Sequence, residues 1–334
     1  MTTVGCIGAG QLGRMLALAG VPLGLSFRFL DPAPDACAAE VGELVVAHYD
    51  DPDGLDRLAD GAAAVTYEFE NVPVAAGERV GTIPGIRSLE EGQDRLREKE
   101  LFRSLGIPTA RFGSLAETGV PALVKTRRLG YDGKGQRRVD DARAPLDDGE
   151  LAEELVHFDR ELSIIGVRGI DGEMRFWPVG ENVHRDGILR VTRAPADARQ
   201  GDAERICAAV LESLGHVGVL AVELFDVGGR LLANELAPRV HNTGHWTIDG
   251  AETSQFENHV RAILGLPLGS TAATGRCVMV NLIGDVPPLA DLLALRGARV
   301  HLYGKEPRAA RKVGHVTLVD PDEAIADRLV ALAG

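Results

Sequence analysis

The sequence predicts a multidomain protein of mixed α/β and α+β class, and three observations support this fold class. Its 334 residues exceed the length of a typical single domain. Residues 1–90 alternate short apolar runs with amphipathic stretches, which is the pattern of βαβ units and a parallel sheet. From about residue 93 a charged helix begins, and helices and hairpin-like strands then follow without that regular alternation.

The composition is that of an ordinary globular protein, with 45% hydrophobic and 25% charged residues. A formal net charge of −13 disfavours non-specific binding to nucleic acids or anionic membranes, so an anionic substrate needs a local basic pocket. The four cysteines are far apart and lack the spacing of a zinc site, which favours reduced core thiols. With no signal-like or membrane-spanning segment in the sequence, we expect a cytoplasmic protein.

The first element is a strand over residues 4–7, followed by a glycine turn and a helix over 12–19. Gly8, Gly10 and Gly13 form the pattern G-x-G-x-x-G of dinucleotide-binding loops, and Asp31 stands where a ribose-binding acid is expected. Close packing in any strand-turn-helix unit explains the glycines as well, and on this motif alone it is favoured over a dinucleotide site. In a parallel sheet this loop and the stretch YEFENVP at 67–73 both fall at the carboxyl ends of strands.

The elements that follow are predicted from apolar periodicity and turn residues. A charged helix ends at Gly106, before Pro108, and the strand PALVKTR at 121–127 leads into a glycine-rich stretch. We expect a second helix at 146–156, strands over 160–195, a helix at 201–215, and a hairpin turning at 227–229. The last 60 residues indicate a small separate unit of strands with one terminal helix.

The glycine-rich stretch RRLGYDGKGQRRV suits a phosphate-binding loop. Gly130, Gly133 and Gly135 leave backbone N–H groups that can close over phosphate oxygens, with Lys134 inside the loop and Lys125 on the preceding strand. A solvated hairpin turn is the alternative, and the stretch is not a Walker A motif.

The predicted hairpin carries two carboxylates within apolar runs. Glu223 and Glu235 can face the same side, and such a pair, with Asn234 beside it, suits one or two Mg²⁺ ions that bridge nucleotide phosphates. A solvated face is the alternative, but carboxylates in these runs are costly to bury unless they bind a positive group.

Two polar clusters follow the hairpin. The loop at 238–247 contains Arg239, His241, Asn242 and His245, which are suited to substrate and transition-state contacts; for His245 a structural role is favoured. The stretch 303–316 contains the basic residues Lys305, Arg308, Arg311 and Lys312 in an otherwise acidic chain, which fits a phosphate-bearing metabolite; a solvated loop is the alternative, above all for Arg308.

These motifs together resemble a known family. GQLGRM, YEFENV, QDRLREKELF, GYDGKGQ, HRDGILR, NELAPRVHNTGHWT and YGKEPRAARKVGH, in this order from residue 10 to 315, are similar to the N5-carboxyaminoimidazole ribonucleotide synthetases, ATP-grasp ligases of purine biosynthesis. The resemblance implies conversion of 5-aminoimidazole ribonucleotide, bicarbonate and MgATP into N5-carboxyaminoimidazole ribonucleotide, ADP and phosphate, through carboxyphosphate, by a homodimer. It also implies a doubly wound substrate-binding domain at 1–92, an ATP-grasp domain at 93–268 with a lid at about 122–160, and a small C-terminal domain at 269–334.

The resemblance also implies residue roles, taken position by position. The nucleotide-side positions are Arg95, Lys125, Gly130, Tyr131, Asp132, Gly133, Lys134, Gly135, Gln136, Glu153, Glu154, Leu155, Val156, Glu161, His184, Asn234 and Glu235. The metal ligands are Glu223 and Glu235. The aminoimidazole ribonucleotide positions are Gln11, Leu12, Glu68, Tyr131, Asp132, Arg239, His241, Asn242, Lys305, Arg311 and Lys312.

Four of these residues are expected to take part in catalysis: Arg239, His241, Glu68 and Asp132. We expect Arg239 to stabilise the bicarbonate and carboxyphosphate oxyanions, and either Glu68 or Asp132 to hold the amine or take its proton. The family often has Arg where this chain has Lys134, so bidentate phosphate holding is lost there. Under this interpretation the opening glycines form one wall of the substrate pocket, and Asp31 is an ordinary strand-end residue.

Three alternatives remain open at this point. An NAD-dependent oxidoreductase would use the opening glycines but leaves Glu223 and Glu235 unexplained. A formate-dependent glycinamide ribonucleotide transformylase shares the lid and the metal carboxylates, and NELAPRVHNTGHWT is the stretch that distinguishes it. A nucleotide-binding regulatory protein without turnover is disfavoured by the intact polar residues.

Overall fold

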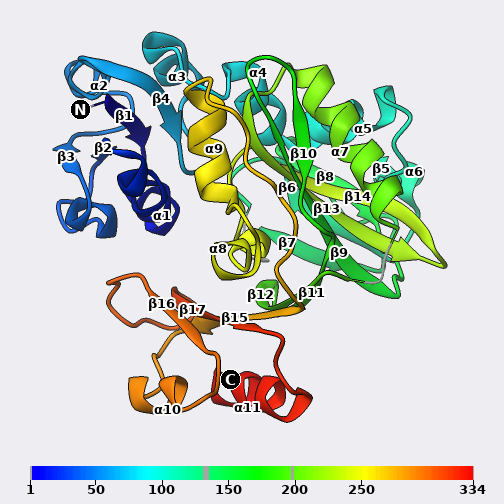
Figure 1. Cartoon of the computed structure of the whole chain (residues 1–334). Coiled ribbons are helices and arrows are strands. Elements are labelled where there is room, and N and C mark those ends of the chain that lie inside the picture. Colours follow the sequence, from blue (N-terminus) through cyan, green and yellow to red (C-terminus); the bar gives the residue numbers. More distant parts are fainter. Residues whose placement is uncertain (1, 131–134, 197–198, 334) are drawn as a thin grey trace.

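The computed structural model describes residues 2–130, 135–196 and 199–333, and the strands in these ranges form three sheets (Figure 1). The N-terminal sheet is parallel, with strand order β3-β2-β1-β4. Its strands are β1 (Thr2–Ile7), β2 (Leu25–Asp31), β3 (Glu43–Val46) and β4 (Ala62–Tyr67). The chain order reverses beside β1, so the loops after β1 and β4 meet at the carboxyl edge.

Helices cover both faces of the N-terminal sheet, which confirms the doubly wound prediction. The first four helices are α1 (Gln11–Gly20), α2 (Pro52–Ala59), α3 (Val74–Val80) and α4 (Ile86–Gly92). Alternate strand residues point to opposite faces. Phe27 and Phe29 pack with α1 and with α9 (Gln255–Ile263), whereas Leu30 and Tyr67 pack with α2 and α3.

The central sheet has nine strands among the described residues, in the order β14-β13-β9-β11-β12-β15-β17-β16, with β10 paired to β9. Its strands are β9 (Arg160–Arg168), β10 (Met174–Phe176), β11 (Gly180–Arg185), β12 (Ile188–Ala194), β13 (Gly218–Val227), β14 (Arg230–Ala237), β15 (Cys277–Ile283), β16 (Arg299–Leu302) and β17 (Lys312–Val319). The run SIIGV of β9 is buried on both faces, between α7 (Gln200–Leu214) and α9. The predicted hairpin is β13 and β14.

A third, antiparallel sheet occupies the region where we expected the lid, in the order β5-β8-β6-β7. Its elements are β5 (Phe112–Gly113), α6 (Leu115–Thr118), β6 (Ala122–Thr126), β7 (Gln136–Val139) and β8 (Glu150–Glu154), and it follows α5 (Arg95–Ser104). The helix predicted at 146–156 is wrong, because Glu150–Glu154 is a strand paired with β6 and β5. Leu151 and Ala152 are buried against the strand partners, and this packing outweighs the helical propensity of the run ELAEEL.

The last 60 residues are joined to the central sheet rather than separate from it. Strand β15 pairs with β12 from Val191 to Ala194, and β17 and β16 continue the sheet. The unit is completed by α10 (Leu289–Leu293) and α11 (Glu323–Ala333), while α8 (Thr247–Gly250) lies before α9. Three short 3₁₀ turns span Val21–Leu23, Cys37–Glu40 and Asn242–Gly244.

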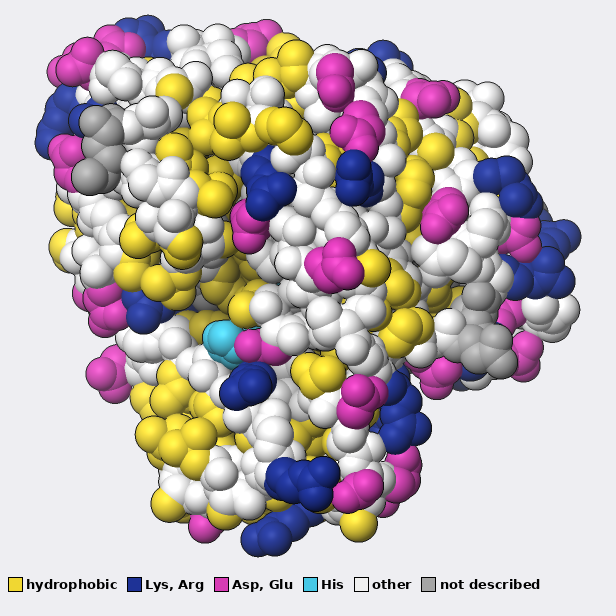
Figure 2. Space-filling view, viewed as in Figure 1, with side chains coloured by type: hydrophobic (Ala, Val, Ile, Leu, Met, Phe, Trp, Pro, Cys, Tyr) yellow, Lys and Arg dark blue, Asp and Glu magenta, His cyan; other side chains and the backbone are white. Residues whose placement is uncertain are grey.

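The surface and the cysteines are ordinary for a globular chain. On the face shown in Figure 2, Lys and Arg are interspersed with Asp and Glu, and apolar side chains gather at the lower left, where Figure 1 places α10 with the exposed Leu289 and Leu293. The cysteines are buried and unpaired, as predicted: Cys6, Cys37, Cys207 and Cys277. In the part of the chain that is described, no helix is long and apolar enough to cross a membrane.

Candidate active site

A cavity of about 500 Å³ brings residues of the central sheet and the third sheet together with residues of α1 and of the turn after β4. Fifteen of the predicted site residues line it: Gln11, Leu12, Arg95, Lys125, Gly130, Gln136, Glu161, His184, Glu223, Asn234, Glu235, Arg239, His241, Asn242 and Lys312. Residues predicted for the nucleotide and residues predicted for the ribonucleotide therefore share one space.

The two hairpin carboxylates meet inside this cavity. Glu223 and Glu235 are directly opposite each other in the β13–β14 ladder, where paired side chains are about 5 Å apart at Cβ. Burial, together with the neighbouring Glu235, raises the pKa of Glu223 to about 7. Asn234 Oδ1 is buried beside them without a hydrogen-bond partner among the described residues. Two carboxylates and one neutral oxygen are the hard donors that Mg²⁺ prefers.

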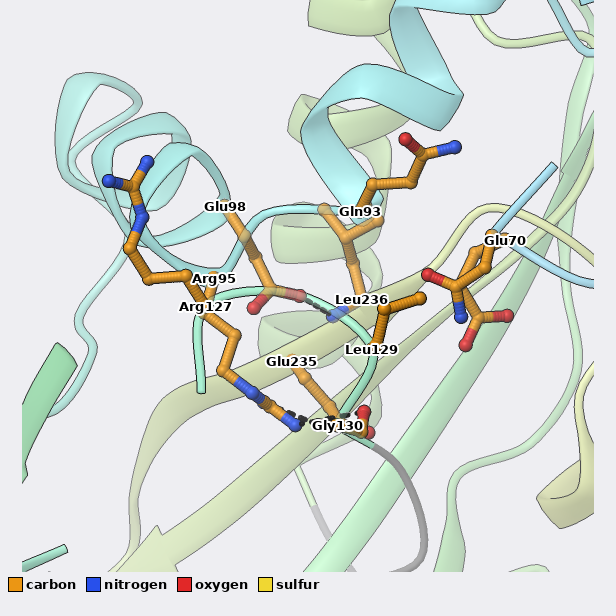
Figure 3. Close-up of a pocket in the computed structure, with 11 residues that line it drawn as sticks. Glu70, Gln93, Arg95, Glu98, Arg127, Leu129, Gly130, Glu235 and Leu236 are labelled. Atoms are coloured by element: carbon orange, nitrogen blue, oxygen red, sulfur yellow. Dashed lines mark hydrogen bonds and ion pairs between the residues drawn. The ribbon is translucent and has the colours of Figure 1, made fainter. Parts of the chain in front are cut away.

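Arg95, at the start of α5, is the counterion of this acidic pair. Its Nη1 donates to Glu235 Oε2 at 3.0 Å, and the pair lies between the cavity and a side chamber of about 40 Å³ (Figure 3). Burial alone would raise the pKa of Glu235, but Arg95 and then Lys125 lower it. Glu98, one helical turn further along α5, accepts the Leu236 N–H, and burial beside Glu235 raises its pKa to about 8.

Lys125 enters the cavity from β6 of the third sheet. Its Nζ donates to Glu153 Oε2 at 3.0 Å, and the same oxygen is 3.3 Å from Nζ of Lys99. Burial opposes the charged form of Glu153, but Lys99 and Lys125 together lower its pKa to about 2. Burial also lowers the pKa of Lys99, while Glu153 and Glu98 oppose that shift. Glu153 thus contributes its side chain to an ion cluster behind the cavity wall.

The far end of the cavity is apolar with a polar rim. Phe158 stacks on Phe225, with ring centroids 4.6 Å apart and an interplanar angle of 5°, and Phe158 is 41% exposed. Beside them Glu161 and His184 share a hydrogen bond. Burial would lower the pKa of His184, but Glu161 and Glu223 raise it. Such an end suits a planar base with a sugar at the acidic rim.

Arg239 and His241 line the opposite wall. The Arg239 guanidinium donates from Nε to Glu70 and from Nη1 to the Val240 carbonyl, which fixes its plane. His241 Nδ1 accepts the Thr243 N–H at 3.4 Å, and its Nε2 is 3.7 Å from Glu223 Oε1. Burial, then the charge of Arg239, lowers the pKa of His241 to about 3, so its ring is neutral at pH 7 with the proton on Nε2.

The glycine turn after β1 is filled by a side chain of the protein itself. Glu68 accepts the N–H of Gly10 and, at 2.7 Å, that of Gly13, so its carboxylate occupies the helix N-terminus where a phosphate would sit in a dinucleotide-binding loop. Asp31 is also satisfied locally, because it accepts the Ala9 N–H at 3.0 Å and the Tyr49 hydroxyl at 2.9 Å.

Some predicted residues lie elsewhere. Lys305 donates to Gln11 at the cavity edge, and Arg311 Nη1 donates to the Glu306 carbonyl at 3.1 Å. The predicted residues that do not line the cavity are Glu68, Gly135, Glu153, Glu154, Leu155, Val156, Lys305 and Arg311. Tyr131, Asp132, Gly133 and Lys134 lie outside the described residues.

The sequence analysis missed three features of the site: Glu70, Lys99 and the stacking of Phe158 on Phe225. Glu70 holds Arg239 and stands two positions after Glu68, in the turn that follows β4. Lys99 stands four positions after Arg95, on the same face of α5. Both spacings are visible in the sequence, whereas the stacking of Phe158 on Phe225 depends on a contact between β13 and the loop before β9.

An acidic pair on one antiparallel sheet, in a cavity that it shares with a lysine of a second antiparallel sheet, is the arrangement of an ATP-grasp enzyme, an ATP-dependent ligase. Family models agree: "ATP-grasp domain" matches residues 101–256, "Ribonucleotide synthetase preATP-grasp domain" matches 1–87, and "Phosphoribosylaminoimidazole carboxylase C-terminal domain" matches 277–328. The chain belongs to the N5-carboxyaminoimidazole ribonucleotide synthetase family.

The relatives cover almost the whole chain. The N5-carboxyaminoimidazole ribonucleotide synthase of Pseudomonas aeruginosa is 49% identical over 98% of this chain and 97% of its own. The crystal structure of the Thermus thermophilus synthetase has a TM-score of 0.94 at 52% identity and covers 99% of this chain and 98% of its own. The Aspergillus clavatus synthase, solved in complex with ADP and 5-aminoimidazole ribonucleotide, has a TM-score of 0.88 at 29% identity, with 98% of each chain covered.

Proposed function

We propose that this chain uses ATP to carboxylate 5-aminoimidazole ribonucleotide with bicarbonate, giving N5-carboxyaminoimidazole ribonucleotide, ADP and phosphate through carboxyphosphate. The observation that carries the proposal is the shared cavity, in which Glu223, Glu235 and Lys125 lie in the same space as Arg239 and His241. A reaction that passes a phosphoryl group to bicarbonate and then a carboxyl group to an amine needs both sets of residues within one closed volume.

The nucleotide end is supported by charge and by the apolar platform. We assign the ATP phosphates to Lys125, Arg95 and the loop at 130–136, and the ribose to Glu161 and His184. The adenine would stack near Phe158, with backbone hydrogen bonds from Leu155 and Val156, which follow β8 outside the strand. Glu223, Glu235 and Asn234 would hold one or two Mg²⁺ ions, which supply neutralisation of the phosphate charge.

At the reaction centre we assign the oxyanions to Arg239. A bicarbonate oxygen attacks the γ-phosphorus of ATP and displaces ADP, and negative charge stays on the carboxyl oxygens of carboxyphosphate. Arg239 is preorganised to receive that charge, because Glu70 and the Val240 carbonyl fix its guanidinium before substrate arrives. The neutral His241 presents an Nε2–H donor on the same wall.

In the second step the exocyclic amine attacks the carboxyl carbon, phosphate leaves, and the amine loses a proton. Asp132 remains our prediction for a group that holds the amine or accepts this proton, and it lies outside the described residues. Glu68 is bound to the Gly10 and Gly13 amides, so we assign it the shaping of the loop that presents Gln11 and Leu12.

The 5′-phosphate of the ribonucleotide is assigned to the basic residues at the C-terminal side of the cavity. Lys312 lines the cavity, and Lys305 contacts Gln11 across the gap between β16 and α1. Arg311 precedes Lys312 in the chain, and burial, together with the charges of both, lowers the pKa of Lys305, so a dianionic phosphate would meet three cationic side chains. We further propose a cytoplasmic homodimer, in keeping with the family.

Phosphate release tests the proposal. We expect ATP cleavage to depend on both 5-aminoimidazole ribonucleotide and bicarbonate, and the carboxylated product to be trapped with ¹³C-bicarbonate. Stimulation by glycinamide ribonucleotide and formate instead would assign the chain to the transformylase activity. Release that is indifferent to the aminoimidazole ribonucleotide would refute the proposal.

A further inference from the structure

Lys99 is a lysine that the proposed reaction does not use, yet its side chain is fully buried. Its Nζ donates to the Asn234 carbonyl at 2.7 Å and to Thr109 Oγ1 at 3.2 Å, and it is 3.3 Å from Glu153 Oε2. Burying an ammonium group costs free energy, which these three contacts offset. An apolar side chain would fill the same space without that cost, so the presence of a lysine at this position needs an explanation.

The ion cluster around Lys99 is unequal in charge. Lys99 and Lys125 approach the same oxygen of Glu153, and Glu153 Oε1 is buried without a hydrogen-bond partner among the described residues. Within ion-pair distance two ammonium groups therefore share one carboxylate, which leaves a surplus of one positive charge in this group of three side chains. The nearby Glu235 has an ion-pair partner of its own, Arg95. Of the two lysines only Lys125 lines the cavity, so that surplus faces the ligand.

We infer that Lys99 is a positioning residue, which neutralises Glu153 from the side away from the cavity. The positive charge of Lys125 is then not cancelled by Glu153 and is available to the nucleotide phosphates. Without Lys99, Glu153 would pair with Lys125 alone and cancel it. Lys99 also ties the third sheet, through Glu153, to the Asn234 carbonyl of β14, so the phosphate-binding lysine and the metal-binding strand are held by the same side chain. The inference rests on the proposed placement of Lys125 against the ATP phosphates.

A charge-rescue cycle tests it. We would measure the dissociation constant of MgADP by calorimetry for wild type, Lys99→Met, Glu153→Gln and the double variant, with melting temperatures for each. We expect Lys99→Met to weaken binding by about tenfold or more, because a charge-assisted contact to phosphate is lost. The double variant, in which residue 153 can no longer cancel the charge of Lys125, should recover most of that loss.

A role in packing alone predicts the opposite, since the double variant would bind MgADP no better than Lys99→Met. Arg79→Met is the matched control, because Arg79 pairs with Asp56 on the surface and its loss changes the net charge equally. It should bind as wild type does, and equal weakening in this control would overturn the inference.

Glu153→Gln alone keeps the test decisive if Lys99→Met does not fold. It should bind MgADP as tightly as wild type or more tightly, and binding weakened by about threefold or more would overturn the inference. If wild-type protein releases phosphate in a ribonucleotide-dependent way but the variants do not show these changes in MgADP binding, the proposed function stands and the role inferred for Lys99 is refuted. Wild-type protein that neither binds MgADP nor releases phosphate would refute both.

Discussion

Glu223 and Glu235 face each other across the β13–β14 hairpin, and the carboxyl group of Glu223 has a pKa of about 7 because it is buried against its partner. Two partly buried acids in direct register destabilise a strand pair unless a cation joins them. Under the proposed function, a Mg²⁺ ion bound by both carboxylates would relieve this repulsion.

Glu223→Gln is expected to separate these two effects. Removing one acid relieves the repulsion, so the melting temperature in EDTA should rise by roughly 2 °C. Phosphate release at low Mg²⁺ should fall by about tenfold or more and recover in part as Mg²⁺ is raised. Thermal unfolding and Mg²⁺ titration measure the two outcomes, and an unchanged Mg²⁺ requirement would argue against Glu223 as a ligand.

Arg239→Lys should lower turnover with little change in nucleotide binding. Lysine keeps the charge but cannot reproduce the fixed guanidinium that bonds to Glu70 and the Val240 carbonyl. We expect kcat to fall by about 10²-fold, as for loss of one preorganised oxyanion donor, while the MgADP dissociation constant stays within about threefold. Arg239→Ala with full turnover would remove the oxyanion assignment.

Lys305→Met should affect the ribonucleotide and not ATP. Lys305 touches Gln11 at the substrate end of the cavity, so its loss should raise the KM for 5-aminoimidazole ribonucleotide by about tenfold. Arg308→Met is the control, because Arg308 is exposed in the same segment and should leave both KM values unchanged. A larger change in the KM for ATP than for the ribonucleotide would contradict the assigned orientation.

Two buried neutral histidines make stability depend on pH. His216 donates to the Val219 carbonyl and His259 accepts the Val219 N–H, and burial lowers their pKa values to about 4 and about 3. Below about pH 6.5 these histidines bind protons in the unfolded chain but stay neutral in the folded chain. The free energy of unfolding therefore falls as the pH falls from about 6.5 to 4, by roughly 1.4 kcal/mol per pH unit for each histidine.

Urea unfolding between pH 7 and 4.5 measures this dependence. His216→Gln keeps a donor and an acceptor in place and should reduce the slope by about one proton. An unchanged slope in that variant would show that His216 does not contribute.

Much of the site was predictable because it is local in sequence. The tight turn predicts that Glu223 and the Asn234–Glu235 stretch lie on neighbouring strands, but counting back from it places Asn234 opposite Glu223. A register shift between Glu223 and Leu224, which the sequence does not reveal, makes Glu235 the partner. The glycine motif misleads for the same local reason, since no pattern around Gly8 reveals that Glu68, from the loop after β4, occupies the turn.

The remaining features depend on contacts between distant segments. The run at 146–156 has helical composition, but pairing with β6 makes it a strand, and only the folded sheet places Glu153 between two lysines. Arg239 was predicted, but the acid that fixes it comes from the other domain. The predicted domain boundaries near residues 92 and 268 remain predictions.

The C-terminal unit contributes Lys312 to the cavity, and its strand β15 also covers the edge of β12. A chain cut before residue 277 would leave β12 as an open edge, with unpaired backbone groups and a bared Val191. Such an edge is a template for intermolecular strand addition. The last 58 residues of the chain thus protect the edge of the central sheet against aggregation, and β15 cannot be removed without capping that edge in another way.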